Sequence, residues 1–315
     1  MRETGGRRRA FRIRGITLKT KVRRLKHLSP GDIAIIAIIV IWGLAILLPF
    51  INIIMISFAS EIEYLSTRVF LFPKQPILDS YEELLLRDGR IGIGYRNTLT
   101  ILLCAVPLSM FCTMSFAYGS SRPLFPGRKI IFYFVLVTML FSGGVIPTYM
   151  LMRGLGLTNN LGSVILASTM STFYMVIMRN YLTSLPDSLI ESAKLDGAGE
   201  WRVLWSIVLP LSAPIIATIT LFYTVDRWNE WYYPMIFLQS GKLQTLQLVL
   251  RSIVLESRVD AIVVSSGGSI MYDKQNFTMG LKTATIIITM LPVMMVFPFL
   301  QKHFVKGVLV GAVKA

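Results

Sequence analysis

The sequence predicts an all-helical integral membrane protein with six transmembrane helices, and three observations support this class. First, the 315 residues are 54% hydrophobic and only 16% charged, with a mean hydropathy of +0.62, a combination that is rare in soluble domains. Second, several apolar runs reach the roughly 20 residues that a spanning helix needs. Third, the basic residues that produce the net charge of +15 gather beside these runs. We therefore expect contact with membrane lipid and no nucleic-acid partner, although such a charge would suggest one in a soluble protein.

Six apolar stretches qualify as spans, namely 33–58, 98–117, 130–151, 161–178, 203–223 and 284–300. The apolar segment 232–238 is too short to cross a bilayer. The remaining organisation follows from these spans: a basic tail at 1–30, a first transmembrane helix within 31–60, an outer segment at 61–96 with a short surface helix near Tyr81–Leu86, a membrane core at 97–301, and a C-terminal tail at 302–315.

The distribution of charge predicts the orientation of these spans. Eleven of the first thirty residues are Lys or Arg. If this tail lies inside the cell, the inner segments sum to a net charge of about +14 and the outer segments to about +1, as the positive-inside rule expects. Both termini are therefore predicted to be cytoplasmic. The first apolar run is too long for the core of a cleaved signal peptide, so we expect it to remain as a span.

Chemistry on this chain is not expected. The sequence contains no phosphate-binding loop of the Gly-x-x-x-x-Gly-Lys-Ser/Thr type and no Gly-x-Ser-x-Gly nucleophile motif. His27 and His303 have no partner at metal-ligand spacing, so no metal site is predicted. Cys104 and Cys112 lie inside one apolar run, where small buried hydrophobes are the expected role. The spans carry no charged residue in their middles, which argues against a proton-driven carrier.

The inner segment between the fourth and fifth spans, at 182–202, predicts a short amphipathic helix. Ser184 and Asp187 have the spacing of a capping box, and Gly197 supplies the left-handed residue that ends a helix. A second helix is expected from about Glu200, leading into the fifth span. The residues alone leave two roles open: a helix resting on the membrane surface, or one that docks a partner. The apolar stripe of this helix is Leu189, Ile190 and Ala193.

Two stretches of this segment resemble a known family. Residues Glu191–Ala198 read ESAKLDGA, and Ile207–Pro210 read IVLP after nine intervening residues. This pattern is similar to the "EAA" loop of binding-protein-dependent ABC importers, which reads Glu-Ala-Ala, three residues, Gly, nine residues and Ile-x-Leu-Pro. Ser192 replaces the first Ala, and serine is also small. The resemblance implies the six-helix fold of type I ABC importer transmembrane domains.

The resemblance also implies partners and a role. In this family the loop forms a coupling helix, expected here at about 185–200, that sits in a cleft of a cytoplasmic ATPase subunit. A second homologous permease subunit, two ABC ATPase subunits and an extracellular solute-binding protein complete the importer, in a bacterial cell membrane. ATP and Mg²⁺ would then bind to the ATPase, with no cofactor on this chain. The residues that the resemblance assigns to coupling are Leu189, Ile190, Glu191, Ser192, Ala193, Asp196, Gly197 and Pro210.

Further matches favour the carbohydrate branch of these permeases. Tyr95–Thr98 opens the second span as in that branch, and 226–234 resembles its Trp-Asn-x-aromatic motif. The end of the chain, 304–314, resembles the tail of the maltose-type second permease subunit. A sugar, as an oligo- or polysaccharide fragment, is therefore the expected substrate. The alternatives left open are a permease of this architecture for peptides or amino acids, and a six-span sensor or scaffold.

The aromatic cluster after the fifth span has two interpretations. Trp228 and Trp231 are three residues apart and would share one helix face. They could belong to a membrane aromatic belt, or they could stack on sugar rings while neighbouring polar side chains bind hydroxyl groups. The candidate substrate-path residues are Asn97, Asp226, Trp228, Asn229, Glu230, Trp231 and Tyr232.

A long outer loop is expected at 239–278. The resemblance implies contact with the binding protein there, and a loop without a partner is the alternative. The candidate contact residues are Asp260, Ser265, Gly267, Gly268, Tyr272 and Asp273. Helix-breaking residues lie inside two spans: Gly143, Gly144 and Pro147 in the third, and Pro210 and Pro214 in the fifth. Such residues indicate either a static kink or a point of flexure.

Overall fold

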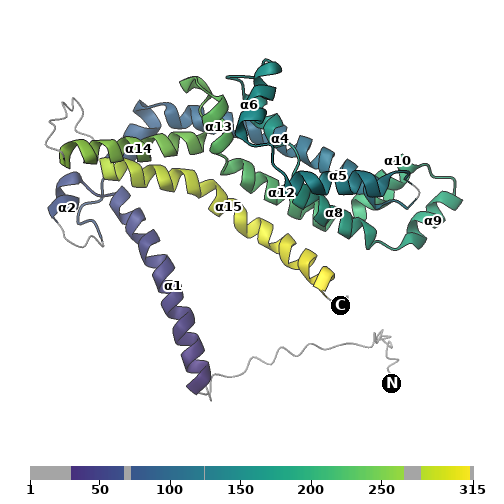
Figure 1. Cartoon of the computed structure of the whole chain (residues 1–315). Coiled ribbons are helices and arrows are strands. Elements are labelled where there is room, and N and C mark those ends of the chain that lie inside the picture. The colour runs from purple at the N-terminus through teal and green to yellow at the C-terminus, as the bar shows by residue number, and fades with distance from the viewer. Residues whose placement is uncertain (1–29, 67–71, 124, 266–277, 313–315) are drawn as a thin grey trace, which may run out of the picture. The chain divides into compact units, whose positions relative to one another are not determined.

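A computed structural model describes residues 30–66, 72–123, 125–265 and 278–312, and within these ranges every regular element is helical. The chain divides into two compact units, Met1–Phe50 and Ile51–Ala315. Figure 1 shows the helices in chain order. An all-helical fold is therefore confirmed for the part of the chain that the structure describes.

The helices have the following bounds: α1 Pro30–Ser57, α2 Glu61–Ser66, α3 Asp79–Glu82, η1 Glu83–Arg87, α4 Arg90–Ser121, α5 Arg128–Leu140, α6 Val145–Gly154, α7 Leu161–Ala167, α8 Thr172–Thr183, α9 Asp187–Leu195, α10 Glu200–Val203, η2 Leu204–Val208, α11 Leu209–Leu211, α12 Ala213–Trp228, α13 Tyr232–Phe237, η3 Gly241–Leu243, α14 Leu246–Ser265 and α15 Thr278–Ala312.

Three of the predicted spans are continuous helices and three are bent. Helices α1, α4 and α15 are each long and apolar enough to cross a bilayer alone. The third, fourth and fifth predicted spans are helix pairs, α5 with α6, α7 with α8, and α10–α11 with α12, bent by 115°, 50° and 79°. By length and composition the described chain therefore has three spans, or up to six if each bent pair counts as one. Helix-breaking residues predicted an interruption in the third and fifth spans, and the bend in the fourth was not predicted.

The break in the third span lies where its glycines predicted it. Helix α5 ends at Leu140 and α6 begins at Val145, after Gly144, whose φ is +85°. Only glycine adopts such a backbone readily. Pro147 lies inside α6 and does not form the break. The glycine pair, rather than the proline, therefore sets this bend.

The break in the fifth span is centred on Ser212, between its two prolines. Pro210 and Pro214 have no backbone N–H, so the carbonyls one turn earlier lose their helical partners. The wide π-turn η2 ends at Val208, two residues before Pro210. The hydroxyl of Tyr181 donates to the Leu211 carbonyl oxygen at 2.9 Å, which satisfies one acceptor at the bend. A proline bend in a membrane helix needs such replacement partners.

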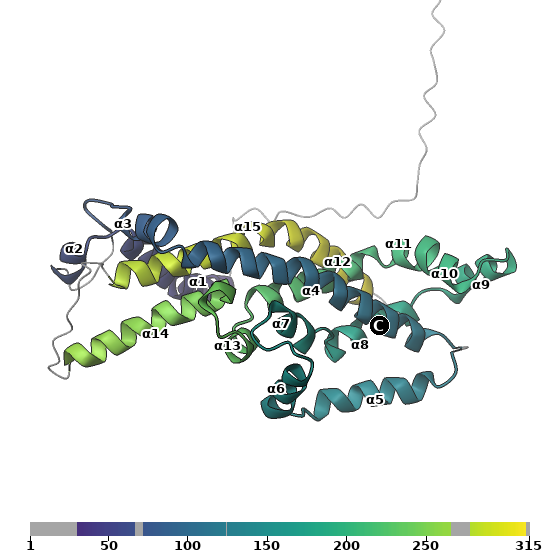
Figure 2. The same cartoon turned by 90° about the horizontal axis from the view of Figure 1, so that it is seen from above.

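Helix α4 is the centre of the second unit. It contacts α7, α8, α12 and α14, and α15 contacts α12 and α14. Two buried clusters form around it. One includes Met114, Met175, Met178 and Tyr223, and the other includes Trp228, Leu246, Val249 and Ile253. Seen from above in Figure 2, α9 and α10 lie at one end of this unit and α14 at the other. The segment predicted to be inner and the helix in the segment predicted to be outer are thus at opposite ends of this unit.

The predicted outer segments are more helical than expected. The Leu-rich run after Tyr81 is a short helix, as predicted, formed by α3 and η1. The expected long loop at 239–278 is largely wrong, because Leu246–Ser265 forms helix α14. Leu246, Val249 and Ile253 are buried at helical spacing, so packing against α4 and α15 stabilises α14 as a helix.

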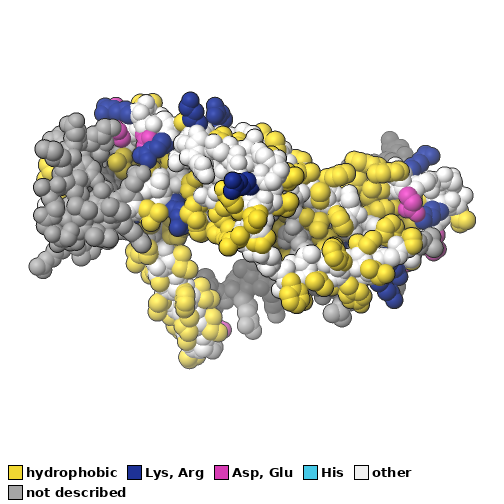
Figure 3. Space-filling view, turned by 45° about the horizontal axis from the view of Figure 1, so that its top comes forward, with side chains coloured by type: hydrophobic (Ala, Val, Ile, Leu, Met, Phe, Trp, Pro, Cys, Tyr) yellow, Lys and Arg dark blue, Asp and Glu magenta, His cyan; other side chains and the backbone are white. Residues whose placement is uncertain are grey.

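Much of the described surface is apolar. Nearly every residue of Pro30–Phe50 in the first unit is exposed and most are Ile, Leu or Val. In the second unit α5 exposes Ile130, Phe134 and Leu140. Figure 3 shows apolar side chains across the face of the molecule. Contiguous apolar surface of this kind matches helices that meet lipid or another subunit.

Candidate functional site

Helix α9 begins at Asp187, and its N-terminus differs from the predicted capping box. Pro186 occupies the N-cap position and makes no side-chain cap. The hydroxyl of Ser184 instead donates to the Tyr181 carbonyl oxygen at 2.7 Å, at the end of α8. The capping-box prediction was therefore wrong. Helix α8 ends at Thr183, and the Ser184 hydroxyl bonds to the last turn of α8 instead of capping α9.

The C-terminus of α9 forms as the glycine predicted. Gly197 has a φ of +79°. Its N–H donates to the Lys194 carbonyl at 3.0 Å, and the Ala198 N–H donates to the Ala193 carbonyl at 2.9 Å. These two bonds form a Schellman motif, which satisfies carbonyls at the helix end and reverses the chain. The chain then enters α10 at Glu200, where the second helix was expected.

The predicted apolar stripe of α9 faces two ways. Ile190 is only 7% exposed and packs in the core of this chain with Leu182 and Val203, and Ala193 packs against the same cluster. Leu189 and Leu195 point outward, and Leu195 is 89% exposed. Ile190, which the resemblance assigns to coupling, therefore anchors α9 to its own subunit.

The polar residues assigned to coupling lie on the exposed surface of α9. Glu191, Ser192 and Asp196 are exposed. The Ser192 hydroxyl donates to the Leu189 carbonyl at 3.1 Å, so it stays within the helix surface and does not project beyond it. Serine thus replaces the family's alanine here without adding bulk. The face that a partner could reach consists of Leu189, Glu191, Ser192, Leu195 and Asp196.

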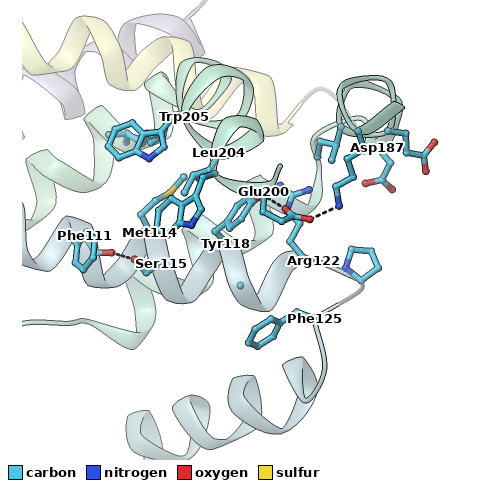
Figure 4. A pocket seen from close by; sticks show the side chains of 18 of the residues that line it. Phe111, Met114, Ser115, Tyr118, Arg122, Phe125, Asp187, Glu200, Leu204 and Trp205 are labelled. Atoms are coloured by element: carbon cyan, nitrogen blue, oxygen red, sulfur yellow. Dashed lines mark hydrogen bonds and ion pairs between the residues drawn. The ribbon is translucent and has the colours of Figure 1, made fainter. Parts of the chain in front are cut away.

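A set of ion pairs and hydrogen bonds joins α9 to the helices behind it, as Figure 4 shows. The Lys194 ammonium donates to Oε1 of Glu200 at 2.5 Å. Oε2 of Glu200 accepts from the Tyr118 hydroxyl of α4 at 2.9 Å. The Arg122 guanidinium lies 4.6 Å from the centroid of the Tyr118 ring. We call Tyr118, Arg122, Lys194 and Glu200 the latch. It connects α9 to α4 and α10.

A cavity of about 950 Å³ lies beside the latch (Figure 4). Helix α4 forms one wall, α9 and α10 form the polar end, and η2 with α12 closes the apolar side. Neither the latch nor the cavity was predicted from the sequence. The pairing of Lys194 with Glu200 had a local signal, since the residues are six apart across a glycine turn. The contribution of Tyr118 had no sequence signal, because Tyr118 and Glu200 are 82 residues apart in the chain.

Pro210 lies at the break of the fifth span described above and is exposed. Its position connects α10, which carries Glu200 of the latch, with α12. Any displacement of α9 that reaches α10 must therefore pass through a bend to reach α12. This geometry fits the expected place of Pro210 between the inner segment and the membrane helix.

Arg227 near the end of α12 is a buried cation that sequence analysis did not single out. It is 8% exposed. One guanidinium nitrogen donates to the Ser168 hydroxyl and the other to the Ser168 carbonyl at 3.1 Å. Oε2 of Glu230 lies 3.8 Å away. Ser168 begins the break between α7 and α8, so Arg227 satisfies backbone that the break exposes.

Tyr223 performs a similar task one turn earlier on α12. Its hydroxyl accepts from the Ser171 N–H at 3.0 Å and bonds the Thr113 hydroxyl at 2.6 Å. Tyr223 and Arg227 are four residues apart and share one helix face. That spacing was the available sequence signal for a polar face on the fifth span. The two side chains hold both ends of the 168–171 break.

The two predicted sugar-stacking tryptophans do not share a face. Helix α12 ends at Trp228, which is buried and donates its indole N–H to the Thr289 carbonyl at 3.1 Å. Trp231 follows the helix end and is 38% exposed. Arg251 of α14 lies 4.1 Å from the Trp231 ring centroid, and exposed Tyr232 packs edge-on against Trp231. The shared-face expectation was wrong, and of the three aromatic candidates Trp231 and Tyr232 are the ones that offer ring surface outward.

The polar substrate-path candidates have structural partners. Asn97 is buried and donates to the Lys242 and Gln244 carbonyls, each at 2.9 Å. Oε1 of Glu230 accepts from the N–H groups of the first two residues of α13. Asp226 and Asn229 are exposed: Asp226 accepts from the Tyr174 hydroxyl at 2.7 Å, and Asn229 donates to the Val225 carbonyl at 3.0 Å. Asn97 and Glu230 therefore hold the outer loops in place.

The predicted binding-protein contacts are only partly visible. Asp260 and Ser265 lie on α14. Gly267, Gly268, Tyr272 and Asp273 lie outside the described residues. Among the residues that are described, no group of three or more His, Cys, Asp or Glu side chains is placed to hold a metal ion.

In its described residues the chain is all-helical, with three apolar helices long enough to span a membrane and three bent apolar helix pairs, which is the architecture of an integral membrane protein. This chain belongs to the family of binding-protein-dependent transport system inner membrane components, which matches residues 92–310. The family resemblance expected from the EAA-like loop is thereby confirmed, and so is a location in the inner membrane. The family is one of membrane transport components rather than catalytic subunits.

Individual relatives are similar along most of their length. Protein LplC of Bacillus subtilis is 38% identical over 86% of this chain and 90% of that protein. A second relative is the polygalacturonan/rhamnogalacturonan transport system permease protein YtcP of Bacillus subtilis. It is 37% identical over 90% of this chain and 98% of YtcP. A chain of a bacterial ABC transporter involved in import of the acidic polysaccharide alginate has 29% identity and a TM-score of 0.78, covering 88% of this chain and 99% of that one. This chain shares the fold of that transporter.

Proposed function

We propose that this chain is a permease subunit of an ATP-driven importer for sugars, taken up as oligo- or polysaccharide fragments. The family is that of binding-protein-dependent transport components. Relatives over most of the chain are named for transport of polygalacturonan or rhamnogalacturonan and of arabinooligosaccharides, and the similar solved structure imports alginate. An extracellular binding protein delivers the sugar, a second permease completes the path, and two cytoplasmic ATPase subunits hydrolyse ATP. Both termini lie in the cytoplasm.

Coupling occurs through α9, and the latch is the single observation that carries this proposal. The exposed face of α9, with Leu189, Leu195 and Glu191, docks on an ATPase subunit. Ile190 and the Lys194–Glu200 pair fix the opposite face of α9 to the permease core. Because Glu200 also accepts from Tyr118, motion of α9 displaces α4 and α10 together. A helix held only by lipid contacts would transmit no such motion.

The bent spans give this motion a path toward a gate. Alternating access requires at least two arrangements of the membrane helices. Displacement at α10 reaches α12 through the bend at Ser212, and α12 holds the break of the fourth span through Tyr223 and Arg227. We propose that the two arrangements differ at these bends. Each bend is stabilised by side chains that bind the backbone groups freed there.

The sugar meets the chain at Trp231 and Tyr232, whose exposed rings can stack on the C–H faces of sugar units. Asp226 and Asn229 are exposed nearby in the sequence and can bind hydroxyl groups. The binding protein is proposed to contact the end of α14 and the segment that follows. Trp228 and Asn97 support these surfaces from within and do not take part in stacking.

Reconstituted transport tests this function. The chain is assembled with its second permease and ATPase subunits in liposomes, with the binding protein on the side opposite to the ATPases. We expect ATP-dependent accumulation of labelled oligosaccharide, absent with a hydrolysis-deficient ATPase. Accumulation of peptides or amino acids instead would reject the sugar assignment. An assembly that stimulates no ATP hydrolysis and moves no solute would favour the sensor or scaffold alternative.

A further inference from the structure

The cavity beside the latch has the dimensions and polarity of a phospholipid site. Its wall runs along α4 from Met110 to Arg122, which directly follows the helix; twelve rises of one residue each correspond to about 18 Å. One leaflet of the hydrocarbon core is about 15 Å deep. The apolar end is formed by Phe111, Met114 and Ile216, and the polar end by the latch. A molecule that fills this space must be apolar over about a leaflet's depth and polar at one end.

Arg122 at the polar end has unused hydrogen-bonding capacity. Its Nε and Nη2 atoms are buried and have no hydrogen-bond partner among the described residues. Buried guanidinium N–H groups without acceptors are costly, so such a group in a native fold calls for a bound partner. An anionic oxygen is the strongest acceptor for them, and a phosphate offers two. On the predicted topology, this end of the cavity is at the cytoplasmic surface, where basic pockets between membrane helices bind lipid head groups.

The remaining charges of the cavity select the head group. Lys194 and Glu200 neutralise each other at 2.5 Å. Asp187 and Glu191 then remain as exposed carboxylates on the α9 side of the same cavity. An acid group beside a phosphate site repels a lipid of net negative charge and attracts an ammonium group. The combination of one guanidinium and two carboxylates suits a zwitterionic head group.

The aromatic residues at the rim agree with a lipid neighbour. Trp201 and Trp205 line the cavity and are 73% and 65% exposed. They lie four residues apart on α10 and η2, on one side of the segment. Exposed indoles at this level of a membrane protein are typical of the interface between head groups and acyl chains.

We propose that this cavity binds one cytoplasmic-leaflet phospholipid of the phosphatidylethanolamine type. Its phosphate accepts from Arg122, its ammonium faces Asp187 and Glu191, and an acyl chain lies along Phe111 and Met114. The lipid thereby occupies space between α4 and the base of the fifth span and contacts Arg122 and Tyr118 of the latch. This site is separate from the proposed sugar surface, and it shares Glu191 with the face of α9 that is proposed to dock on the ATPase.

Lipid retention by the assembled importer tests the site. The complex is purified from membranes containing phosphatidylethanolamine, phosphatidylglycerol and phosphatidylcholine in equal amounts, and retained lipids are counted by native mass spectrometry. We expect one retained phosphatidylethanolamine, and a loss of about tenfold or more in its retention for Arg122→Gln, because charge-assisted bonds are removed. Lys129→Gln, which removes an exposed charge from the same inner segment but does not line the cavity, should retain the lipid.

A second variant fills the cavity without disturbing the fold. A Cβ at Gly119 would meet nothing within 4 Å, and Gly119 lines the cavity. Gly119→Phe should therefore assemble normally and lose the retained lipid. A photoreactive phosphatidylethanolamine should label wild type and not this variant. Equal retention of phosphatidylglycerol, or crosslinks from a photoreactive residue at 119 to another subunit in place of lipid, would overturn the proposal.

Discussion

Replacing Gly197 with valine is expected to reduce uptake to background and to abolish stimulation of the ATPase. Gly197 has a φ of +79°, and a residue with a side chain loses about 1–2 kcal/mol in that conformation. A loss of this size changes the population of the folded turn by a factor of about 5–30. The two hydrogen bonds of the Schellman motif, to the carbonyls of Ala193 and Lys194, would break, and α9 would no longer end at Leu195. Lys194 would then separate from Glu200. Uptake and ATP hydrolysis by the reconstituted importer measure the effect.

Gly199→Ala is the matched control for this change. Gly199 is two residues further on, precedes α10 with a φ of −70°, and has open space at its Cβ position. An alanine there needs no change of backbone, so uptake should stay close to wild type. If Gly197→Val transports normally while expressed in the membrane complex, α9 has no coupling role.

Replacing Arg227 with methionine is expected to destabilise the permease by about 3 kcal/mol, because buried charge-assisted hydrogen bonds are lost and a buried partner is left behind. The Ser168 hydroxyl and carbonyl lose their donor, and Glu230 loses its nearest cation. The break between α7 and α8 would then contain an unsatisfied carbonyl within the membrane region. A lower melting temperature and less complex in the membrane should report this loss.

Two variants separate this effect from a loss of charge in general. Arg227→Lys keeps the charge but cannot donate to both Ser168 acceptors in a fork, so an intermediate stability is expected. Arg251→Met removes a half-exposed guanidinium that stacks on Trp231 and should leave the melting temperature nearly unchanged. A complex of Arg227→Met as stable as wild type would show that the 168–171 break needs no support from α12.

The inner helix was largely predictable from the sequence because its ends are determined locally. Gly197 sets the end of α9, and the next helix begins at the acidic residue expected, Glu200. The orientation of Ile190 was not predictable. Three apolar residues on a nine-residue helix indicate that one face is buried, but they do not indicate whether it packs on the same chain or on a partner. Ser184 was assigned to the wrong helix for a related reason. A serine between two helices can serve either one.

The bends and the latch depended on contacts distant in sequence. Glycines marked the break of the third span and prolines that of the fifth, but the break of the fourth contains neither residue type. Its break at 168–171 is stabilised from α12 by Tyr223 and Arg227, more than fifty residues away. The helix α14 had a visible signal in Leu246, Val249 and Ile253, at helical spacing within a segment interpreted as loop because it is polar and glycine-bearing.

Photocrosslinking from position 195 tests the central claim most directly. Leu195 lies on the face of α9 that is proposed to meet the ATPase and is 89% exposed, so a photoreactive amino acid placed there is available to a partner. In the assembled importer we expect the crosslink to join this chain to an ATPase subunit, and its yield to change between ATP-bound and ATP-free states. Crosslinks to lipid alone, in both states, would contradict coupling through α9.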